Sequence, residues 1–367
     1  MDGPFVDGGI TVGTIARPWS PCSNGPRSEE RVLMRARKIQ LSGFGGPEVL
    51  QVAEFEVPAL GPRDVLVRSH AIGVGWPDVY VRTGTYPWQH LFPMPATPGI
   101  EMAGRVAAAG AEVADLQVGR PVYVSSRLMG FRGGCYAEAM VVPRDVLVEL
   151  PGNVDLDVAA GLAYYQLAVA LLRAAGAARP AGWAMVSGAS GGVGTALVQT
   201  AKAFGYRVLA SVGHDDKRAH ATAVGADAVI NYRTDAAAAA IAGITGGHGV
   251  DLWLESFVGP DFGQVFRSMA PWGKVMLYNA VGGHPAPAFF DDWRAAMGKC
   301  VSVQYFSMHV YEDDPQAMRD LLSAAMRLIV DGAIKPPAGT FFKLEDAAQA
   351  HRLLESGTNR GRIFLRP

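Results

Sequence analysis

A glycine-rich turn is the segment of this chain whose residue types and spacing most clearly indicate chemistry. Residues 186–194 read V-S-G-A-S-G-G-V-G, with Gly188, Gly191 and Gly194 three positions apart. Glycine lets a turn approach a ligand closely, and the N-terminus of a following helix offers unpaired N–H groups and a positive dipole end. Such a turn suits a pyrophosphate. Because a glycine pattern also occurs in ordinary strand–helix turns, the flanking elements must decide between the two interpretations.

The elements around this turn predict a doubly wound parallel sheet. The apolar run 183–187 is expected to be a buried strand, and apolar residues recur at helical spacing over 192–205. Strand-like runs then alternate with helical segments, which indicates parallel strands with helices on both faces and a ligand site beyond the strand ends. The further strands are expected at 206–212, 226–230, 249–254, 273–278 and 301–306, and the further helices at 217–224 and 261–270. No Gly-Lys-Ser/Thr follows the turn, which disfavours a P-loop enzyme.

Composition excludes several classes of protein. The 367 residues favour two domains, and the formal net charge of −1 gives no indication of a nucleic-acid partner. Three cysteines without paired spacing argue against a disulfide framework or a structural zinc site. No apolar run approaches the roughly 20 residues of a membrane span, and no N-terminal apolar segment suggests secretion. We therefore expect a cytoplasmic enzyme with a small-molecule substrate and no membrane partner.

The chain divides into segments of different character. Residues 1–34 are rich in Gly, Pro and Ser and are expected to form a flexible N-terminal extension. Residues 35–155 are rich in strand-like runs punctuated by Gly and Pro, which is typical of an antiparallel β domain. The last part, 308–367, ends in a strand that we expect to return to that domain. The predicted organisation is thus a discontinuous β-rich catalytic domain, 35–155 and 308–367, around a nucleotide-binding domain, 156–307.

Eight short segments, in order along almost the whole chain after residue 34, carry a resemblance to a known family. They are F-G-G-P-E-V-L (44–50), D-V-Y-V-R-T-G-T-Y-P (78–87), P-G-I-E-M-A-G (98–104), V-G-R-P-V (118–122), G-C-Y-A-E (134–138), A-S-G-G-V-G (189–194), G-A-D-A-V-I-N-Y (225–232) and G-R-I-F-L (361–365). In these the chain resembles the medium-chain dehydrogenase/reductase superfamily, and within it the zinc-free quinone oxidoreductase group. The resemblance implies a Rossmann domain, a GroES-like catalytic domain, a nicotinamide cofactor and a homodimer.

The positions at which zinc-dependent members of the resembled superfamily hold their metal carry no ligand here. Gly75 and Trp76 stand in place of a Cys-His pair, and Ile100 in place of the histidine of Gly-His-Glu. We therefore expect no zinc. Without a Lewis acid, reduction of an electrophilic quinone or enone is favoured over alcohol oxidation. Four histidines show no metal-binding spacing and are expected to be surface or strand histidines: His70, His90, His214 and His309.

The residues after the second strand of the nucleotide-binding domain bear on the choice of cofactor. An NAD site usually has Asp or Glu at the strand end, but Gly213 stands there. The resemblance implies that Lys217 and Tyr232 bind the 2′-phosphate of NADPH. NADPH is therefore the predicted cofactor. Asp215 and Asp216 depart from the family pattern and leave NADH possible.

The remaining candidate residues complete the predicted site. The cofactor-binding set adds the turn residues and two strand-end residues: Gly188, Ala189, Ser190, Gly191, Gly192, Val193, Gly194, Ser256 and Asn279. Tyr80 is expected to contact the acceptor's oxygen, although a packing tyrosine is the alternative. The substrate pocket is expected to contain Gly75, Trp76, Tyr86 and Trp88, which would make it largely aromatic.

Three functions are compatible with these residues. The expected function is zinc-independent hydride transfer from NADPH to a quinone or an α,β-unsaturated carbonyl. An enoyl-thioester reductase of the same superfamily is the first alternative. The second is a non-catalytic NADPH-binding protein, like the crystallins of this superfamily.

Overall fold

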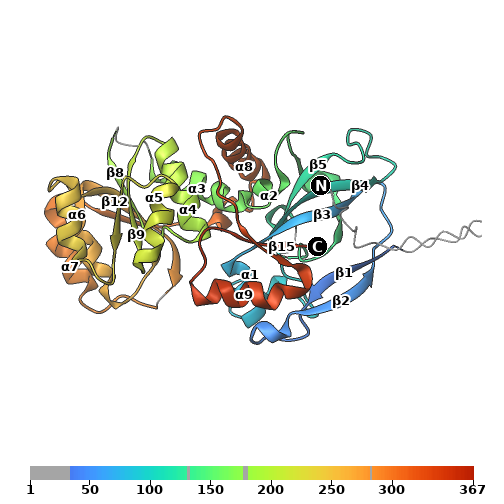
Figure 1. The fold of residues 1–367 in the computed structure, drawn as a ribbon, viewed down its shortest axis with the longest axis horizontal. Coiled ribbons are helices and arrows are strands. Elements are labelled where there is room, and N and C mark those ends of the chain that lie inside the picture. Colours follow the sequence, from blue (N-terminus) through green and yellow to red (C-terminus); the bar gives the residue numbers. More distant parts are fainter. Residues whose placement is uncertain (1–33, 130–132, 177–180, 282) are drawn as a thin grey trace, which may run out of the picture.

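Two separate sheets organise the chain. The computed structural model describes residues 34–129, 133–176, 181–281 and 283–367. A parallel sheet with helices on both faces stands beside a β-rich unit, and the C-terminal segment crosses back onto that β-rich unit (Figure 1). The predicted fold class, a Rossmann sheet plus a discontinuous GroES-like unit, is confirmed.

The parallel sheet has the strand order expected of a Rossmann fold. Its strands, in spatial order, are β10 (Ala228–Asn231), β9 (Arg207–Val212), β8 (Trp183–Val186), β11 (Val250–Phe257), β12 (Met269–Val281) and β13 (Ser302–Tyr305). All neighbouring pairs run parallel. The chain adds strands outward on one side of β8 and then returns to add β11, β12 and β13 on the other side. Such sheets bind nucleotides in a cleft at the carboxyl ends of the two strands where this switch occurs, here β8 and β11.

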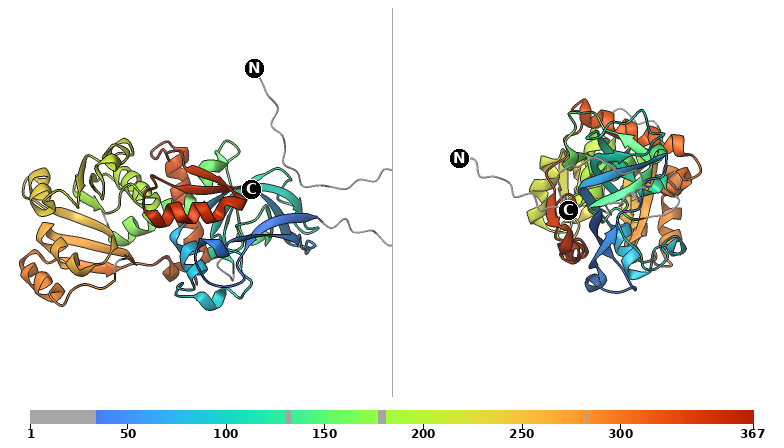
Figure 2. Two further views of the ribbon diagram at one scale, coloured as in Figure 1. Left: turned by 60° about the horizontal axis from the view of Figure 1, so that its bottom comes forward. Right: turned by 90° about the vertical axis from the view of Figure 1, so that its right-hand side faces the viewer.

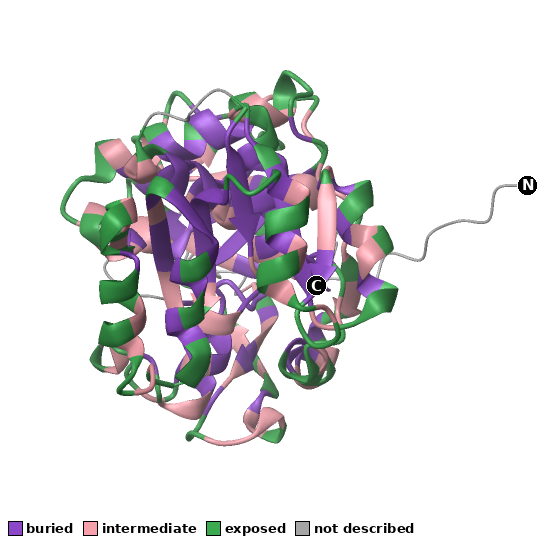
Figure 3. Ribbon diagram, turned by 90° about the vertical axis from the view of Figure 1, so that its left-hand side faces the viewer, coloured by how far each residue is buried: buried purple, intermediate pink, exposed green. Residues whose placement is uncertain are grey.

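Both faces of this sheet are covered, which explains its near-continuous apolar strands. Ala184 and Val186 of β8 belong to one core and Trp183 and Met185 to the other, because successive side chains point to opposite faces. Figure 3 shows the buried strands enclosed by helices with exposed outer surfaces. The helices of this part are α3 (Leu162–Ala175), α4 (Gly192–Ala203), α5 (Arg218–Ala223), α6 (Ala237–Thr245), α7 (Phe289–Ala295) and α8 (Pro315–Val330).

One predicted helix is a 3-10 helix and ends early. The segment expected as a helix over 261–270 is η6 (Pro260–Ser268), and Met269 already begins β12. The apolar residues are still buried together in one core. The helix ends early because Met269 pairs with Val250 of β11 in parallel register, which requires an extended backbone at that residue.

The β-rich unit surrounds the long strand β3. Its main sheet has the order β14 (Thr340–Lys343), β15 (Ile363–Arg366), β3 (Asp64–Val74), β4 (Glu101–Ala109), β5 (Pro121–Ser125) and β7 (Leu147–Glu149), with β6 (Ala139–Pro143) also on β3. A hairpin-like pair is formed by β1 (Arg35–Gln40) and β2 (Gln51–Glu56). Three helices accompany this unit: α1 (Trp76–Thr83), α2 (Leu156–Ala159) and α9 (Ala347–Ser356). The other short 3-10 turns are Pro47–Val49, Gln89–Leu91, Ser126–Leu128, Arg144–Val146, Asp215–Lys217, Met297–Lys299, Met308–Tyr311 and Leu344–Asp346.

The C-terminal return predicted from the sequence is present. β15 pairs antiparallel with β3, so that Ile363 lies opposite Val74. Figure 2 shows this segment against the β-rich unit from a second direction. The domain boundaries given above stay a prediction, and α8 contributes side chains both to the core of the parallel sheet and to the core beneath β3.

Two further expectations concern the N-terminal extension and membrane-spanning helices. The flexible extension over 1–34 lies, except for Met34, outside the described residues. Within the described segments, no helix has the length and apolar character needed to cross a membrane.

A buried histidine beneath the β-rich unit predicts how stability depends on pH. His351 of α9 is fully buried, with its Nε2 3.1 Å from the Tyr136 hydroxyl. Burial lowers the pKa of His351 to about 3, and the charge of Arg82 acts in the same direction. In the unfolded chain this imidazole protonates below about pH 6.5, so acid favours unfolding.

We therefore expect the free energy of unfolding to fall by about 2 kcal/mol more in the wild type than in His351→Gln between pH 7 and pH 5. Urea unfolding at both pH values measures this difference. The glutamine retains a hydrogen-bonding group for Tyr136 but does not titrate. Parallel pH dependence in the two proteins would show that His351 protonates freely in the folded state.

Candidate active site

The glycine turn connects β8 to α4 and fits the geometry expected for it. Gly188 has a left-handed backbone with φ of 63°, and Gly191 caps α4. A Cβ on Gly194 would lie 2.2 Å from the carbonyl oxygen of Gly188, so the third glycine is required for the helix to pack on the turn. The first N–H groups of α4 have no partner within the helix and are free to face a ligand.

A cleft of about 370 Å³ opens in front of this turn. Eleven of the twelve predicted cofactor residues line it: Gly188, Ser190, Gly191, Gly192, Val193, Gly194, Gly213, Lys217, Tyr232, Ser256 and Asn279. Ala189 does not, because its side chain is buried and its N–H donates to the carbonyl oxygen of Ser211 at 3.0 Å. The opposite wall comes from the C-terminal return, residues 356–359, which the sequence had not indicated.

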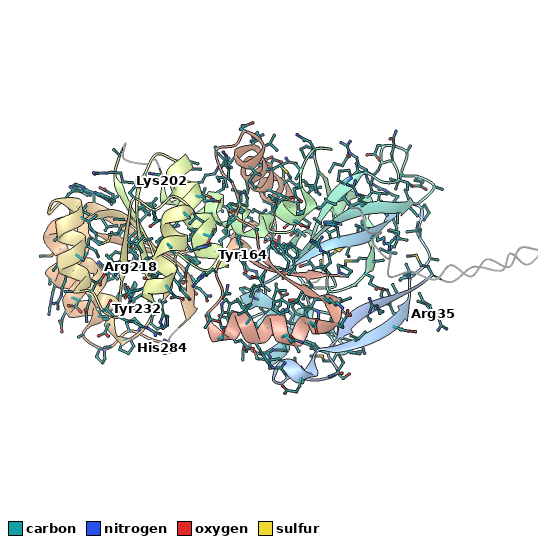
Figure 4. The ribbon with its side chains drawn as sticks, in the orientation of Figure 1. Arg35, Tyr164, Lys202, Arg218, Tyr232 and His284 are labelled. Carbon is teal, nitrogen blue, oxygen red and sulfur yellow. The ribbon has the colours of Figure 1, made fainter. Side chains whose placement is uncertain are left out.

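The far end of the cleft is positively charged. Lys217 and Arg233 line it, and Arg360 lies close enough to act on Lys217. Burial lowers the pKa of Lys217, the charge of Asp216 opposes this, and Arg360 and Arg233 lower it further. The Lys217 ammonium donates to the carbonyl oxygen of Gly357, which fixes it across the cleft. The part of the chain around Tyr232 is visible in Figure 4.

Gly213 and Tyr232 are fitted to each other. A Cβ on Gly213 would lie 2.6 Å from the Tyr232 hydroxyl, so that hydroxyl occupies the space of a side chain at the strand end. The two acidic residues that depart from the family pattern, Asp215 and Asp216, each accept a hydrogen bond from an arginine. Asp215 accepts from Arg218 at 2.7 Å and Asp216 accepts from Arg360 at 2.8 Å.

A second cavity, of about 310 Å³, adjoins the nucleotide cleft. It contains four of the predicted residues of the reacting centre, and five residues line both cavities. The predicted residues are Tyr80, Trp76, Tyr86 and Trp88, and the shared residues are Trp76, Tyr164, Val193, Tyr278 and Asn279. The two cavities therefore lie side by side and share one wall, and Figure 4 shows Tyr164 where the two units meet.

Gly75, also predicted for the substrate pocket, lines neither of these two cavities. It caps α1, and its N–H donates to Oδ2 of Asp78 at 2.9 Å. A Cβ on Gly75 would lie 2.6 Å from the hydroxyl of Tyr164, which occupies that space instead. Sequence reasoning missed Tyr164, because it looks like one aromatic residue of an apolar helix and lies far along the chain from Gly75.

The positions that carry zinc ligands in zinc-dependent members of the resembled superfamily lie around a buried carboxyl group in this chain. Asp78 accepts from the N–H groups of Gly75 and Gly99, both at 2.9 Å, and so ties together the two segments that carry Trp76 and Ile100. Burial raises the pKa of Asp78 to about 7, against the effect of those two hydrogen bonds and of Arg362. In the described part of the chain, no three His, Cys, Asp or Glu side chains are grouped closely enough to hold a metal ion.

A buried ion pair supports the boundary between the two cavities. Glu101 and Arg362 contact each other beneath Tyr164, and the Arg362 guanidinium stacks 3.5 Å from the centroid of that ring. Glu101 also accepts from the Tyr123 hydroxyl at 2.8 Å and from the Ala163 N–H at 2.9 Å. Burial raises the pKa of Glu101, and the neighbouring Arg362 opposes that rise.

His309 corrects a prediction. Expected at the surface or in a strand, it lies in the 3-10 turn Met308–Tyr311, and its side chain is only 15% exposed. Its ring stacks on Trp88 with centroids 3.4 Å apart, and its Nε2 lies 3.4 Å from the Tyr86 hydroxyl. The sequence could not indicate this position, since the contact joins residues 221 positions apart.

Comparison with known proteins agrees with the fold and the cleft. Residues 61–152 match the family described as alcohol dehydrogenase GroES-like domain, and residues 192–324 match the family described as zinc-binding dehydrogenase. The three positions at which zinc ligands are replaced, Gly75, Trp76 and Ile100, lie outside this second match. Two such domains around one cleft define the medium-chain dehydrogenase/reductase superfamily.

Individual relatives narrow this class. The chain is 31% identical over 337 residues to the quinone oxidoreductase of Lama guanicoe, covering 91% of this chain and 97% of that protein. A quinone oxidoreductase structure from Pseudomonas syringae pv. Tomato DC3000 has a TM-score of 0.79 at 30% identity, covering 90% of this chain and 100% of the other. Escherichia coli quinone oxidoreductase complexed with NADPH has a TM-score of 0.76 at 28% identity, with the same coverages. The chain belongs to the quinone oxidoreductase group of the medium-chain dehydrogenase/reductase superfamily.

Proposed function

We propose that this chain transfers hydride from NADPH to a quinone or an α,β-unsaturated carbonyl compound without a metal ion. The observation that carries the proposal is that the two cavities lie side by side. A polar cleft at a glycine turn shares Tyr164 and Asn279 with a pocket walled by Trp76 and Trp88. A dinucleotide suits the first space, and a flat apolar acceptor suits the second.

The residues of the cleft fit the proposed cofactor. The Gly194 position has no room even for a methyl group, and this close packing of α4 on the turn holds its N–H groups where a pyrophosphate binds. NADPH, when bound, supplies two electrons and one hydrogen as hydride. Asn279 at the end of β12 lies where the two cavities join, which suits a contact to the reacting half of the cofactor.

Charge at the far end of the cleft supports NADPH over NADH. Lys217 and Arg233 provide cations and Tyr232 a hydroxyl donor, while Gly213 offers no carboxylate to repel a phosphate. Asp215 and Asp216 are neutralised by arginines, which removes the main reason to prefer NADH. The similar Escherichia coli structure is complexed with NADPH, in agreement with this proposal.

The side chains at the positions of the zinc ligands support a reaction without zinc. Gly75, Trp76 and Ile100 have no side-chain atom that binds a metal. The nearby Asp78 carboxyl group already accepts a backbone N–H on each oxygen. An acceptor that is already electrophilic needs no Lewis acid, which is why quinones and enones are the proposed substrates.

The chain's own residues would act mainly by positioning and by excluding water. The aromatic walls, Trp76 and Trp88, surround an apolar acceptor, and electrostatic interactions strengthen where water is displaced. The Tyr80 hydroxyl in this pocket is proposed to hydrogen-bond the acceptor's oxygen as negative charge develops there. Tyr164 fills the space beside Gly75 and lines both cavities.

The experiment compares three acceptors with purified protein and NADPH: 1,4-benzoquinone, an α,β-unsaturated ketone and an enoyl thioester. Oxidation of NADPH with the quinone or the ketone, and slower oxidation with the thioester, is the expected result. A preference for the thioester would favour an enoyl-thioester reductase. Binding of NADPH with no turnover of any acceptor would favour a non-catalytic nucleotide-binding protein.

We also propose a homodimer. Among the described strands, β13 forms one edge of the parallel sheet, and its Tyr305 is 62% exposed. Nearby, Phe290 and Met297 are 70% and 76% exposed. A second copy of the chain would cover this edge and these apolar side chains. Light scattering on a sizing column tests this, and a monomer at micromolar concentration would contradict it.

A further inference from the structure

The wall of the acceptor pocket contains a histidine–carboxylate pair that the proposed reaction has not yet used. His309 lines the pocket opposite Tyr86 and stacks on Trp88. Its Nδ1 contacts Oε1 of Glu312, three residues further along at the C-terminal cap of the same 3-10 turn. Its Nε2 lies 3.4 Å from the Tyr86 hydroxyl. The imidazole is therefore held by a carboxylate on one nitrogen and directed at a pocket hydroxyl by the other.

This arrangement has the features of an oriented acid–base group. A carboxylate at one ring nitrogen stabilises the protonated imidazole and fixes which nitrogen faces the pocket. Stacking on Trp88 restrains the plane of the ring. The charged or titratable groups around His309 include Glu312, Tyr86 and, 3.8 Å from Glu312, Arg127.

Reduction of the proposed acceptor requires such a group. Hydride adds two electrons and one hydrogen to a carbon of the acceptor and leaves negative charge on its oxygen, and one proton must follow. Most other proton-bearing side chains that line the pocket are phenols, whose ordinary pKa lies near 10. Burial raises the pKa of two of them, Tyr164 and Tyr278, further. An imidazole is the better acid near neutral pH.

We propose that His309, oriented by Glu312, supplies this proton through the Tyr86 hydroxyl. This inference rests on the proposed function. The Tyr86 O–H bond breaks as a new O–H bond forms on the reduced acceptor, and the Nε2–H bond of His309 breaks as Tyr86 regains its proton. His309 is then neutral and takes a proton from water before the next turnover. No oxidant or reductant beyond the nicotinamide cofactor is needed.

The first test replaces the imidazole by a ring that cannot donate. In His309→Phe the stacking on Trp88 can be kept, but the proton is lost. We expect kcat for 1,4-benzoquinone to fall by about 100-fold, with a diminished solvent deuterium isotope effect and unchanged NADPH affinity. His248→Gln is the matched control, since His248 lies just before the amino end of β11, lines neither cavity and pairs with Asp251.

The second test addresses the role of Glu312. Without its carboxylate, the His309 proton is lost more easily, so the fall of kcat at alkaline pH should move to lower pH in Glu312→Gln. In protein without cofactor, proton NMR should show a histidine resonance that is absent from His309→Phe and titrates at lower pH in Glu312→Gln. Added imidazole should partly restore turnover in His309→Ala.

The outcomes separate this inference from the function on which it rests. If the wild type oxidises NADPH with the quinone, and His309→Phe does so with unchanged kcat and isotope effect, His309 is not the proton donor. A Glu312→Gln pH profile identical to that of the wild type would overturn the role of Glu312. Failure of the wild type itself to turn over would instead contradict the proposed function.

Discussion

Gly213→Asp is expected to weaken NADPH binding by about 100-fold or more, because like charges brought together cost several kcal/mol and each 1.4 kcal/mol is tenfold. The aspartate would stand at the end of β9, where the cleft now holds the Tyr232 hydroxyl 2.6 Å from the position of a Cβ. It would repel a 2′-phosphate and push Tyr232 away from it. The same carboxylate can accept from the 2′-hydroxyl of NADH, so NADH affinity should hold or rise.

Calorimetric titration of both cofactors measures this change in preference. Gly243→Asp is the matched control, since it adds the same charge at an exposed position of α6 with no side chain within 4 Å of the new Cβ. Tyr232→Phe separates the two causes, because it removes the hydroxyl without adding charge. If Gly213→Asp binds NADPH as tightly as the wild type, the 2′-phosphate does not lie at the end of β9.

Arg362→Met is expected to lower the free energy of unfolding by about 3–5 kcal/mol, which is typical when one partner of a buried ion pair is removed. Arg362 is buried against Glu101, which is itself 0% exposed. Its loss leaves the Glu101 carboxylate without a cation and removes the guanidinium that stacks on Tyr164. Because Tyr164 borders both cavities, acceptor KM should also rise.

Arg366→Met provides the comparison within the same segment. Arg366 is half exposed and pairs with Asp157 at 2.9 Å, and surface pairs of this kind contribute at most about 1 kcal/mol. The double variant Glu101→Gln, Arg362→Met should recover part of the lost stability, since no buried charge remains. Urea unfolding of the wild type, the two arginine variants and the double variant measures these differences. Equal effects of the two arginine substitutions would mean that the Glu101 pair is not important for stability.

Local patterns in the sequence were enough for the fold and for most of the cofactor cleft. The glycine turn and the alternation of apolar strands with helices depend on residues close together in the chain, so they predicted β8, α4 and the strand ends at Gly213 and Asn279. Ala189 does not line the cleft, and its backbone N–H is used inside the fold. Spacing alone does not show which N–H groups of a turn face outward.

The reacting centre was harder to predict, because distant segments build it. Tyr164 fills the space beside Gly75, Glu101 pairs with Arg362, and His309 stacks on Trp88. Each of these contacts joins segments at least 89 positions apart, and none follows from hydrophobic period or turn composition. The early end of η6 has a similar cause, since pairing between β11 and β12 overrides the helical pattern.

Turnover of a quinone by metal-depleted protein tests the zinc-independent reaction most directly. The protein is dialysed against a chelator, its metal content is measured by mass spectrometry, and NADPH oxidation with 1,4-benzoquinone is followed. We predict less than stoichiometric metal and an undiminished rate. Stoichiometric zinc, with loss of activity on its removal and oxidation of simple alcohols on its return, would contradict the proposed reaction.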